Sequence, residues 1–271
     1  MAHGVTPDDI ALRGVRYARR RAGDWLSETG RLSLMALEMT QAIVQRMPGV
    51  RLVVQQMGAI GVQSLWLVIV VSLFTGAVAA VQAAYQFTSV VPAKYLSGVI
   101  LRSVVIELGP VLTALVIGGR VGASIAAELG TMKVTEQIDA LRAMGINPLR
   151  YLVAPRVIAA VIMLPILTVY ADAIAILGGF VVAVTALEVP VPTYVQGLRE
   201  FFFLKDVMSG LVKAVFFGNI IGFMGCYYGF QTEGGAEGVG RATTGAVVTS
   251  CVLILILDYV LATVLFRIVF A

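Results

Sequence analysis

Residues 60–80 read IGVQSLWLVIVVSLFTGAVAA, and no Asp, Glu, Lys or Arg occurs between Leu52 and Ala93. A helix rises about 1.5 Å per residue, so this stretch is long enough to cross the roughly 30 Å hydrocarbon core of a bilayer. The 271-residue chain is 59% apolar and 13% charged, whereas an average soluble domain carries about 25% charged residues. Together with a mean hydropathy of +0.91, this composition predicts an all-α integral membrane protein.

Four further apolar runs give about five transmembrane helices in all. They cover residues 104–126, 157–184, 210–230 and 245–266. No Pro/Gly/Ser-rich linker or charge block separates two soluble halves, so residues 1–271 are predicted to form a single membrane domain. Within it, residues 1–50 are an interfacial helical segment and residues 51–271 are the transmembrane core.

The distribution of Lys and Arg predicts how the spans are oriented. Eight of these residues precede the first span and four lie between the second and third. Only two lie in each of the loops that follow the first and third spans. Because cytoplasmic loops carry the excess of positive charge, the N-terminus and the loop between spans two and three are expected in the cytoplasm.

The segment before the first span has the pattern of an amphipathic helix that ends at Pro48-Gly49. Its apolar side chains recur at three- and four-residue steps: Leu32, Met35, Met39, Ile43 and Met47. We expect this helix to lie in the membrane interface, where its arginines suit an anionic leaflet. A cytosolic helix that packs on another subunit is the alternative.

A stripe of small residues marks the second span. Gly118, Gly122, Ala126 and Gly130 recur every four residues. Small side chains at this spacing allow close helix–helix packing in lipid. The partner helix is expected either within the same chain or at a dimer seam.

The loop between spans two and three, residues 128–156, reads ELGTMKVTEQIDALRAMGINPLRYLVAPR. Thr131 or Thr135 is expected to cap one short helix, and Gly145 to end it. Asn147-Pro148 prevents its continuation. A helix this short is not stable alone, so we expect a docking partner for it.

Several motifs carry a resemblance to a known family. The run from Asp139 to Gly145 resembles the EAA-x-x-x-G signature of ABC-transporter permeases. More closely, the chain resembles the MlaE/YrbE permease family of MCE-type lipid transporters over about residues 50–268. The matching phrases include ELGP at 107–110, AELG at 127–130, TEQ at 135–137, NPL at 147–149 and GRATT at 240–244.

The resemblance implies a permease of the cell inner membrane that moves phospholipid in outer-membrane lipid homeostasis. It implies cytosolic ABC ATPase subunits, a periplasmic MCE-domain assembly and a small cytosolic accessory subunit as partners. The ATPase-coupling residues it suggests are Glu128, Lys133, Glu136, Gln137, Asp139, Arg142, Gly145 and Arg241. The odd number of spans excludes a simple inverted repeat within one chain, so a homodimer would supply the two-fold axis.

Ionisable residues at bilayer depth are costly and need a partner or a wet cavity. The predicted topology places Glu107, Lys213 and Asp258 at similar depth in the outer half of the membrane. We expect a charged cluster that lines the lipid path, with a buried ionic staple between spans as the alternative. Asp172 has no obvious partner. Ile106 stands where many members of the resembled family carry an arginine, so any headgroup contact of that arginine does not transfer.

Other chemistry has little support in this sequence. No G-x-x-x-x-G-K-[ST] phosphate loop exists, so ATP and Mg²⁺ are expected on a separate ATPase chain and this subunit is expected to be non-catalytic. His3 is the only histidine, so no histidine-based metal site is expected, and basic residues that record topology indicate no nucleic-acid partner. A gradient-driven transporter or channel that uses the intramembrane carboxylates, and a scaffold without transport activity, are the competing functions.

Overall fold

The computed structural model describes residues 30, 33–39, 41, 48–86 and 94–269. The chain divides into two compact units, Met1–Met47 and Pro48–Ala271. In the first unit, residues 30, 33–39 and 41 are helical and lie within the predicted amphipathic helix. Three of its apolar positions, Leu32, Ile43 and Met47, fall outside the described residues, so the interfacial placement of this helix stays a prediction.

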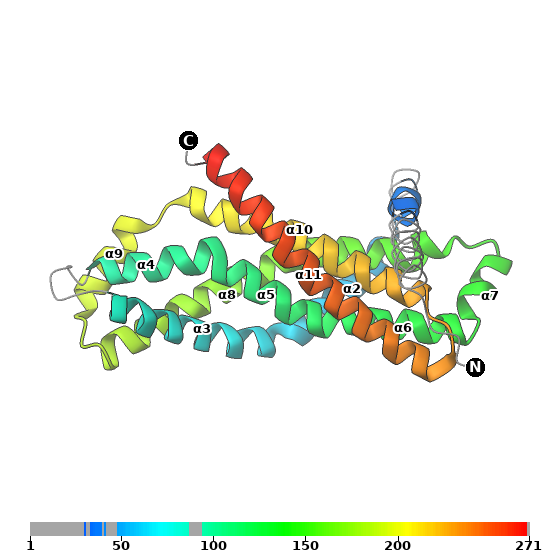
Figure 1. Ribbon diagram of the computed structural model, residues 1–271, viewed down its shortest axis with the longest axis horizontal. Coiled ribbons are helices and arrows are strands. Elements are labelled where there is room, and N and C mark those ends of the chain that lie inside the picture. The colour runs from blue at the N-terminus through cyan, green and yellow to red at the C-terminus, as the bar shows by residue number, and fades with distance from the viewer. Residues whose placement is uncertain (1–29, 31–32, 40, 42–47, 87–93, 270–271) are drawn as a thin grey trace, which may run out of the picture. The chain divides into compact units, whose positions relative to one another are not determined.

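The second unit is all-helical in its described residues, which confirms the predicted fold class (Figure 1). Its α-helices are α2 (Val50–Ile60), α3 (Leu65–Gln86), α4 (Lys94–Ser103), α5 (Gly109–Ile117), α6 (Ala123–Val134), α7 (Gln137–Ala143), α8 (Ala154–Thr185), α9 (Val191–Phe201), α10 (Leu204–Phe230) and α11 (Gly235–Val269). A 3₁₀ turn at Val62–Ser64 joins α2 to α3, and π-helical turns occupy Val104–Leu108, Gly118–Gly122 and Leu149–Val153.

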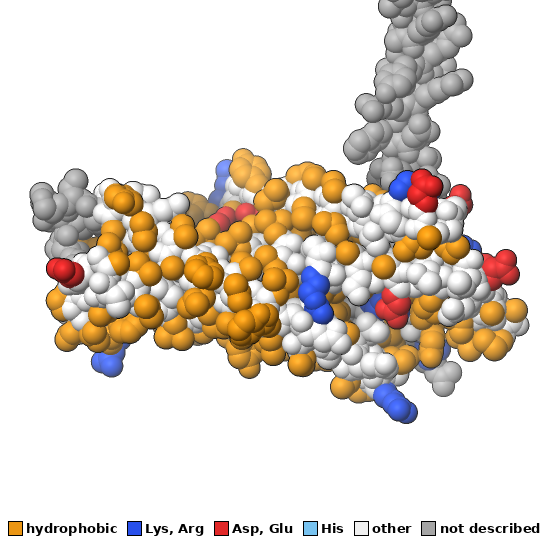
Figure 2. All heavy atoms as spheres, turned by 90° about the horizontal axis from the view of Figure 1, so that it is seen from below, with side chains coloured by type: hydrophobic (Ala, Val, Ile, Leu, Met, Phe, Trp, Pro, Cys, Tyr) orange, Lys and Arg blue, Asp and Glu red, His pale blue; other side chains and the backbone are white. Residues whose placement is uncertain are grey.

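Within the described residues, five helical stretches are long and apolar enough to cross a membrane. They are Val50–Gln86, Lys94–Val134, Leu149–Thr185, Leu204–Phe230 and Gly235–Arg267. Figure 2 shows hydrophobic side chains spread over much of the visible face of this unit, as expected of a surface that faces lipid. The chain is therefore a multi-pass membrane protein, and each helix extends beyond the apolar core that the sequence pattern located.

The second stretch is the clearest case of such an extension. Hydropathy places this span at 104–126, but the helix begins at Lys94 and continues to Val134. Its first turns include Ser97 and Gly98, which lower the local hydropathy but pack against α9. Packing rather than apolar composition therefore fixes this end of the helix.

Helix α8 is the centre of the unit and packs most extensively against α3 and α10. Helix α10 in turn packs against α6 and α11, so the predicted stripe of small residues faces a helix of the same chain. A Cβ added at Gly225 of α10 would lie 3.1 Å from the Gly122 carbonyl oxygen, and one at Gly229 would lie 3.2 Å from the Ala126 carbonyl oxygen. At the stripe itself, a Cβ on Gly118 would find its nearest neighbour, Ile221, at an ordinary 3.6 Å. Gly225 and Gly229 of α10 thus allow that helix to lie close to the backbone of the stripe, and Gly130 of the stripe allows a close approach of Thr232, where an added Cβ would lie 2.7 Å from the hydroxyl oxygen.

Two of the π-helical turns end two residues before a proline. Pro110 follows Val104–Leu108, and Pro155 follows Leu149–Val153. Proline lacks the N–H that an α-helix uses and its ring clashes with the carbonyl four residues earlier, so the preceding turn widens instead. The first of these turns contains Glu107 and therefore sets the direction of that carboxylate.

Candidate functional site

Three charged side chains from three helices meet inside the bundle. Lys213 of α10 is only 1% exposed, and its Nζ contacts the Glu107 carboxylate and lies 2.9 Å from Asp258 Oδ1 of α11. The structure thus brings together the three residues that the depth argument grouped. Two carboxyl groups thus flank one amino group. Asp258 is 16% exposed and Glu107 is 44% exposed, so the cluster opens on the side of Glu107.

A cavity of about 430 Å³ lies beside this open side of the cluster. Its polar lining includes Glu107 and Arg102, and its apolar lining includes Tyr95, Ile106 and Phe201. Ile106, where an arginine was noted as missing, thus contributes an apolar wall. Arg102, about one turn earlier, supplies a cation to the same cavity. The cavity therefore combines charges of both signs with an aromatic and aliphatic wall.

Sequence reasoning missed an ion pair at the edge of this cavity. Arg102 Nε donates to Asp206 Oδ2 over 2.9 Å, and the Asp206 side chain is only 4% exposed. The Phe203 ring lies 5.8 Å from the Arg102 guanidinium carbon. In the sequence, Arg102 served only as a marker of topology. The signal that would have found the pair is an acidic residue, Asp206, in the first turn of a predicted membrane-spanning helix.

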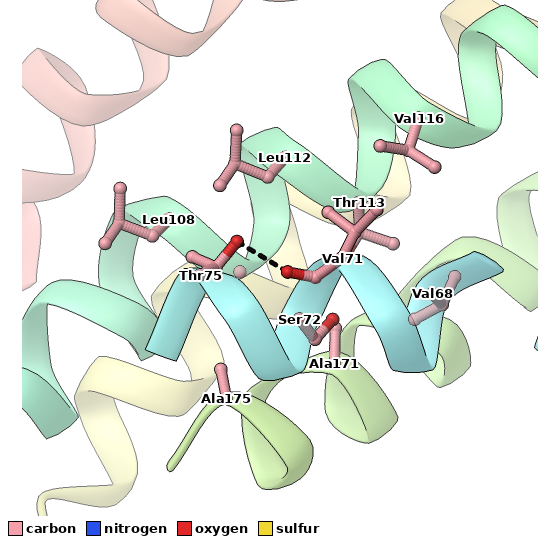
Figure 3. Close-up of a pocket in the computed structure, with 11 residues that line it drawn as sticks. Val68, Val71, Ser72, Thr75, Leu108, Leu112, Thr113, Val116, Ala171 and Ala175 are labelled. Carbon is pink, nitrogen blue, oxygen red and sulfur yellow. Dashed lines mark hydrogen bonds between the residues drawn. The ribbon is translucent and has the colours of Figure 1, made fainter. Parts of the chain in front are cut away.

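A second cavity, between α3, α5 and α8, is much smaller (Figure 3). It measures about 10 Å³, which is room for about one water molecule, and Val68, Leu112 and Ala175 are among its mostly apolar lining. Near it, Asp172 of α8 is buried, with Oδ1 directly against Gly109 and without a hydrogen-bond partner among the described residues. In the described part of the chain, Asp172 therefore makes no ion pair with the Lys213 cluster. The cavity near it is too small for a lipid.

At the opposite end of the unit, the predicted short helix is present but is shorter than expected. Helix α7 spans only Gln137–Ala143. The prediction that Thr131 or Thr135 caps it is wrong, because Thr131 lies inside α6 and Thr135 ends α6. Each threonine hydroxyl donates to the carbonyl four residues earlier, Ala127 and Thr131 respectively, both over 2.8 Å. The chain turns instead at Glu136, which has a left-handed φ of 60°.

Gly145 and Asn147 complete this loop. Gly145 has a φ of +73°, the left-handed conformation with which glycine commonly ends a helix. Asn147 Oδ1 accepts a hydrogen bond from the Leu149 N–H over 2.9 Å and so caps the helical stretch that continues into α8. Ile138 is buried, whereas Met144 is 65% exposed. One side of α7 thus packs on the protein, and the other presents Glu136, Gln137, Asp139 and Arg142 to the outside.

Three of the predicted coupling residues pair with one another. Asp139 Oδ2 lies 3.1 Å from Lys133 Nζ, and Asp139 Oδ1 lies 3.1 Å from Arg142 Nη1. The hydrogen bond from Lys133, with the charge of Arg142 in addition, lowers the pKa of Asp139 below its ordinary value. The carboxylate is therefore ionised at neutral pH, and the group presents alternating charges.

Other predicted residues at this end are also engaged. Glu128 pairs with Arg156 over 2.8 Å, and the Arg156 side chain is only 5% exposed. Arg156 therefore points into the protein and does not extend toward lipid headgroups. Arg120 contacts Ser64 and donates to Gln63 Oε1 over 3.2 Å. Arg241 is exposed and pairs with Glu237 over 2.6 Å.

Within the described residues, no group of three or more His, Cys, Asp or Glu side chains is placed to hold a metal ion. The structure thus offers a charged and apolar cavity near Lys213 and an exposed, charged surface at α7.

Comparison with known proteins decides the family. The family model described as Permease MlaE matches residues 53–264 of this chain. The chain belongs to the MlaE permease family. A probable ABC transporter permease protein of Rickettsia bellii is 42% identical over 261 residues, covering 96% of this chain and 98% of the relative. A probable ABC transporter permease protein of Synechocystis is 41% identical, covering 79% of this chain and 81% of the relative.

A third relative of this MlaE-family chain comes from a plant. The Arabidopsis thaliana protein named trigalactosyldiacylglycerol 1, chloroplastic, is 36% identical over 213 residues, covering 79% of this chain and 61% of the relative. Membership in the family and the five apolar helices together make this chain a membrane permease.

Proposed function

We propose that this chain is the permease subunit of an ATP-driven transporter that moves phospholipid between the inner membrane and a periplasmic MCE-domain assembly. Two copies form a homodimer, with the N-termini and α7 in the cytoplasm. Each α7 docks on a separate ABC ATPase subunit, which binds ATP and Mg²⁺, and a small cytosolic accessory subunit completes the complex. The cellular role is outer-membrane lipid homeostasis.

The observation that supports a lipid substrate best is the cavity beside the Lys213 cluster. Its walls combine Arg102 and Glu107 with Tyr95 and Phe201, so a molecule with a charged head and an apolar tail fits its chemistry. The name of the Arabidopsis relative also refers to a glycerolipid, trigalactosyldiacylglycerol. Under this proposal the headgroup lies near the charges and the acyl chains lie against the aromatic and aliphatic walls.

The helical connection between the two ends supports a mechanical coupling. The stretch Lys94–Val134 is continuous, and it carries Glu107 in one half and leads directly into α7 at its other end. Movement of α7 by a closing ATPase would therefore reach the cavity through one rigid element. The π-helical turns at Val104–Leu108 and Gly118–Gly122 are places where this element departs from a regular α-helix.

Affinity purification from membranes in a mild detergent tests the whole proposal. We expect an ABC ATPase, an MCE-domain protein and phospholipid to co-purify with the chain, as identified by mass spectrometry. Purification without any ATPase, combined with transport driven by an ion gradient, would instead support the competing secondary transporter.

Glu136→Lys is expected to reduce the amount of co-purifying ATPase roughly fivefold to tenfold. Glu136 is exposed at the turn before α7 and has no ion-pair partner among the described residues, so its substitution changes the docking surface without breaking an internal contact. An interface charge of the wrong sign costs binding energy, and tenfold in affinity corresponds to about 1.4 kcal/mol. The ratio of ATPase to permease in the purified complex gives the measurement.

Glu188→Lys is the matched control, because Glu188 is an exposed acid between α8 and α9, has a left-handed φ of 54° like Glu136, and has no ion-pair partner among the described residues. We expect it to leave the ATPase ratio unchanged. Undiminished ATPase in the Glu136→Lys complex would remove the coupling role from this surface. Asp139→Lys is a weaker test, since it also disrupts the contacts with Lys133 and Arg142.

A further inference from the structure

A third cavity lies at the α7 end of the unit and takes no part in the transport path proposed above. It measures about 390 Å³ and lies where the start of α2 meets the loop after α7. We call it the α7-end pocket. Its lining includes Leu52 of α2 and, from the loop, Ile146, Asn147, Arg150 and Tyr151.

The polar groups of the α7-end pocket are hydrogen-bond donors. Arg150 is half-buried and has no acidic partner among the described residues. Asn147 uses its Oδ1 to accept from the Leu149 N–H, so its Nδ2 remains as a donor. Tyr151 is 45% exposed and carries a phenolic O–H. A pocket with a guanidinium and no lining carboxylate selects an anionic oxygen ligand, and guanidinium–phosphate pairs are the strong form of such contacts.

The position of this pocket favours a lipid phosphate. Arg51 lies in the first turn of α2 beside Leu52, is exposed, and has no acidic partner in the described part of the chain. Arg150 lies in the first turn of the helical stretch Leu149–Thr185, so two neighbouring spans each carry an arginine where they enter the apolar region. Arginine and tyrosine at the end of a span are typical of the headgroup layer, where anionic lipids concentrate near basic side chains.

We propose that the α7-end pocket binds the phosphate headgroup of an anionic phospholipid from the surrounding leaflet. Arg150 and Asn147 contact the phosphate, and Leu52 and Ile146 contact the first apolar atoms of the lipid. The bound lipid joins α2 to the loop that holds α7 and so stabilises that loop. This lipid is a resident ligand at the opposite end of the second span from Glu107, and the inference stands whether or not the transport proposal is correct.

Hydrogen exchange of the loop amides measures how much a bound lipid stabilises the loop after α7. Gly145 N–H donates to the Arg142 carbonyl and Ile146 N–H to the Leu141 carbonyl, each over 3.0 Å, and both bonds must open for exchange. The full chain is reconstituted in nanodiscs of phosphatidylcholine alone or with phosphatidylglycerol. A ligand that binds only the closed loop slows amide exchange by a factor of 1 + [lipid]/Kd. This factor is about tenfold when the lipid concentration is about nine times its Kd. We expect that slowing at residues 144–152 with phosphatidylglycerol only.

Matched variants separate a lipid site from a general effect of surface charge. Arg150→Gln is expected to remove the protection, and Arg150→Lys to retain part of it. Arg199→Gln removes an exposed arginine on α9 and is expected to retain all of it. Size-exclusion profiles and circular dichroism establish that each variant remains folded.

Three results would overturn the proposal. One is equal exchange in the two kinds of nanodisc, which would leave the pocket as part of a protein-docking surface. Another is equal protection in the Arg150→Gln variant. The third is protection by millimolar inorganic phosphate in phosphatidylcholine nanodiscs, which would assign the pocket to a soluble anion instead of a lipid.

Discussion

Lys213→Ala is expected to lower the thermal unfolding midpoint of the purified chain by on the order of 10 °C. The Lys213 side chain is 1% exposed and contacts both Glu107 and Asp258. Removal of one partner from a buried ionic group leaves the other charges without compensation and costs about 3–5 kcal/mol. We expect about 3 kcal/mol, at the lower end of that range, because Glu107 is 44% exposed and solvent reaches it. Fluorescence-detected unfolding in detergent gives the measurement.

Lys205→Ala provides the matched control, since Lys205 is an exposed residue at the start of the same helix. We expect a change in the midpoint of less than about 2 °C there, as for most surface substitutions. An equally small change for Lys213→Ala would show that the ion contacts contribute little to stability.

Neutralising the whole cluster distinguishes a lipid path from an ionic staple. The triple variant Glu107→Gln, Lys213→Met, Asp258→Asn removes every charge while keeping similar volumes. Replacement of a whole buried ionic group by neutral residues is often neutral or stabilising, so we expect the midpoint to recover most of the loss. Loss of lipid transport in this stable variant would support the path, and transport at the rate of the unmodified protein would support the staple.

The sequence predicted the spans well because lipid imposes a simple rule on them. Residues that face hydrocarbon are predominantly apolar and uncharged, so the run at 60–80 is recognisable without knowledge of its neighbours. The ends were less predictable. Lys94 and Ser97 begin a helix because they pack on α9, and no local pattern indicates that contact. The widened turn before Pro110 was foreseeable in principle from proline chemistry, whereas the one at Gly118–Gly122 has no proline after it.

In the candidate site, too, some contacts were predictable from the sequence and others needed the structure. Glu107, Lys213 and Asp258 were grouped because topology assigns each a depth, and depth alone limits which charges meet. Arg102 and Asp206 belong to the ends of spans, where solvated charges are ordinary, so their pairing needed the structure. The capping of α7 failed for another reason. Threonine hydroxyls at 131 and 135 bond back to their own helix, which competes with capping of the next one.

Gly76→Ala is expected to destabilise the protein by about 3 kcal/mol and to lower the unfolding midpoint by on the order of 10 °C. A Cβ at Gly76 of α3 would overlap the carbonyl oxygen of Ala175 on α8. Reciprocally, a Cβ at Gly178 of α8 would overlap the Leu73 carbonyl oxygen of α3. Both obstacles are backbone atoms, which no rotamer change can move. The two helices would have to separate, and lipid supplies no hydrophobic force that holds them together.

Gly119→Ala controls for glycine replacement as such, since a Cβ at Gly119 would meet nothing within 4 Å. In that helical position alanine is the better helix former by about 1 kcal/mol, so we expect an unchanged or slightly raised midpoint. A lower midpoint for Gly76→Ala than for Gly119→Ala would therefore assign the destabilisation to the contact between α3 and α8. Similar midpoints for both variants would mean that α3 moves freely against α8. The proposed transmission of α7 motion through the second span needs a rigid bundle around that span. Free movement of α3 against α8 would contradict such a bundle.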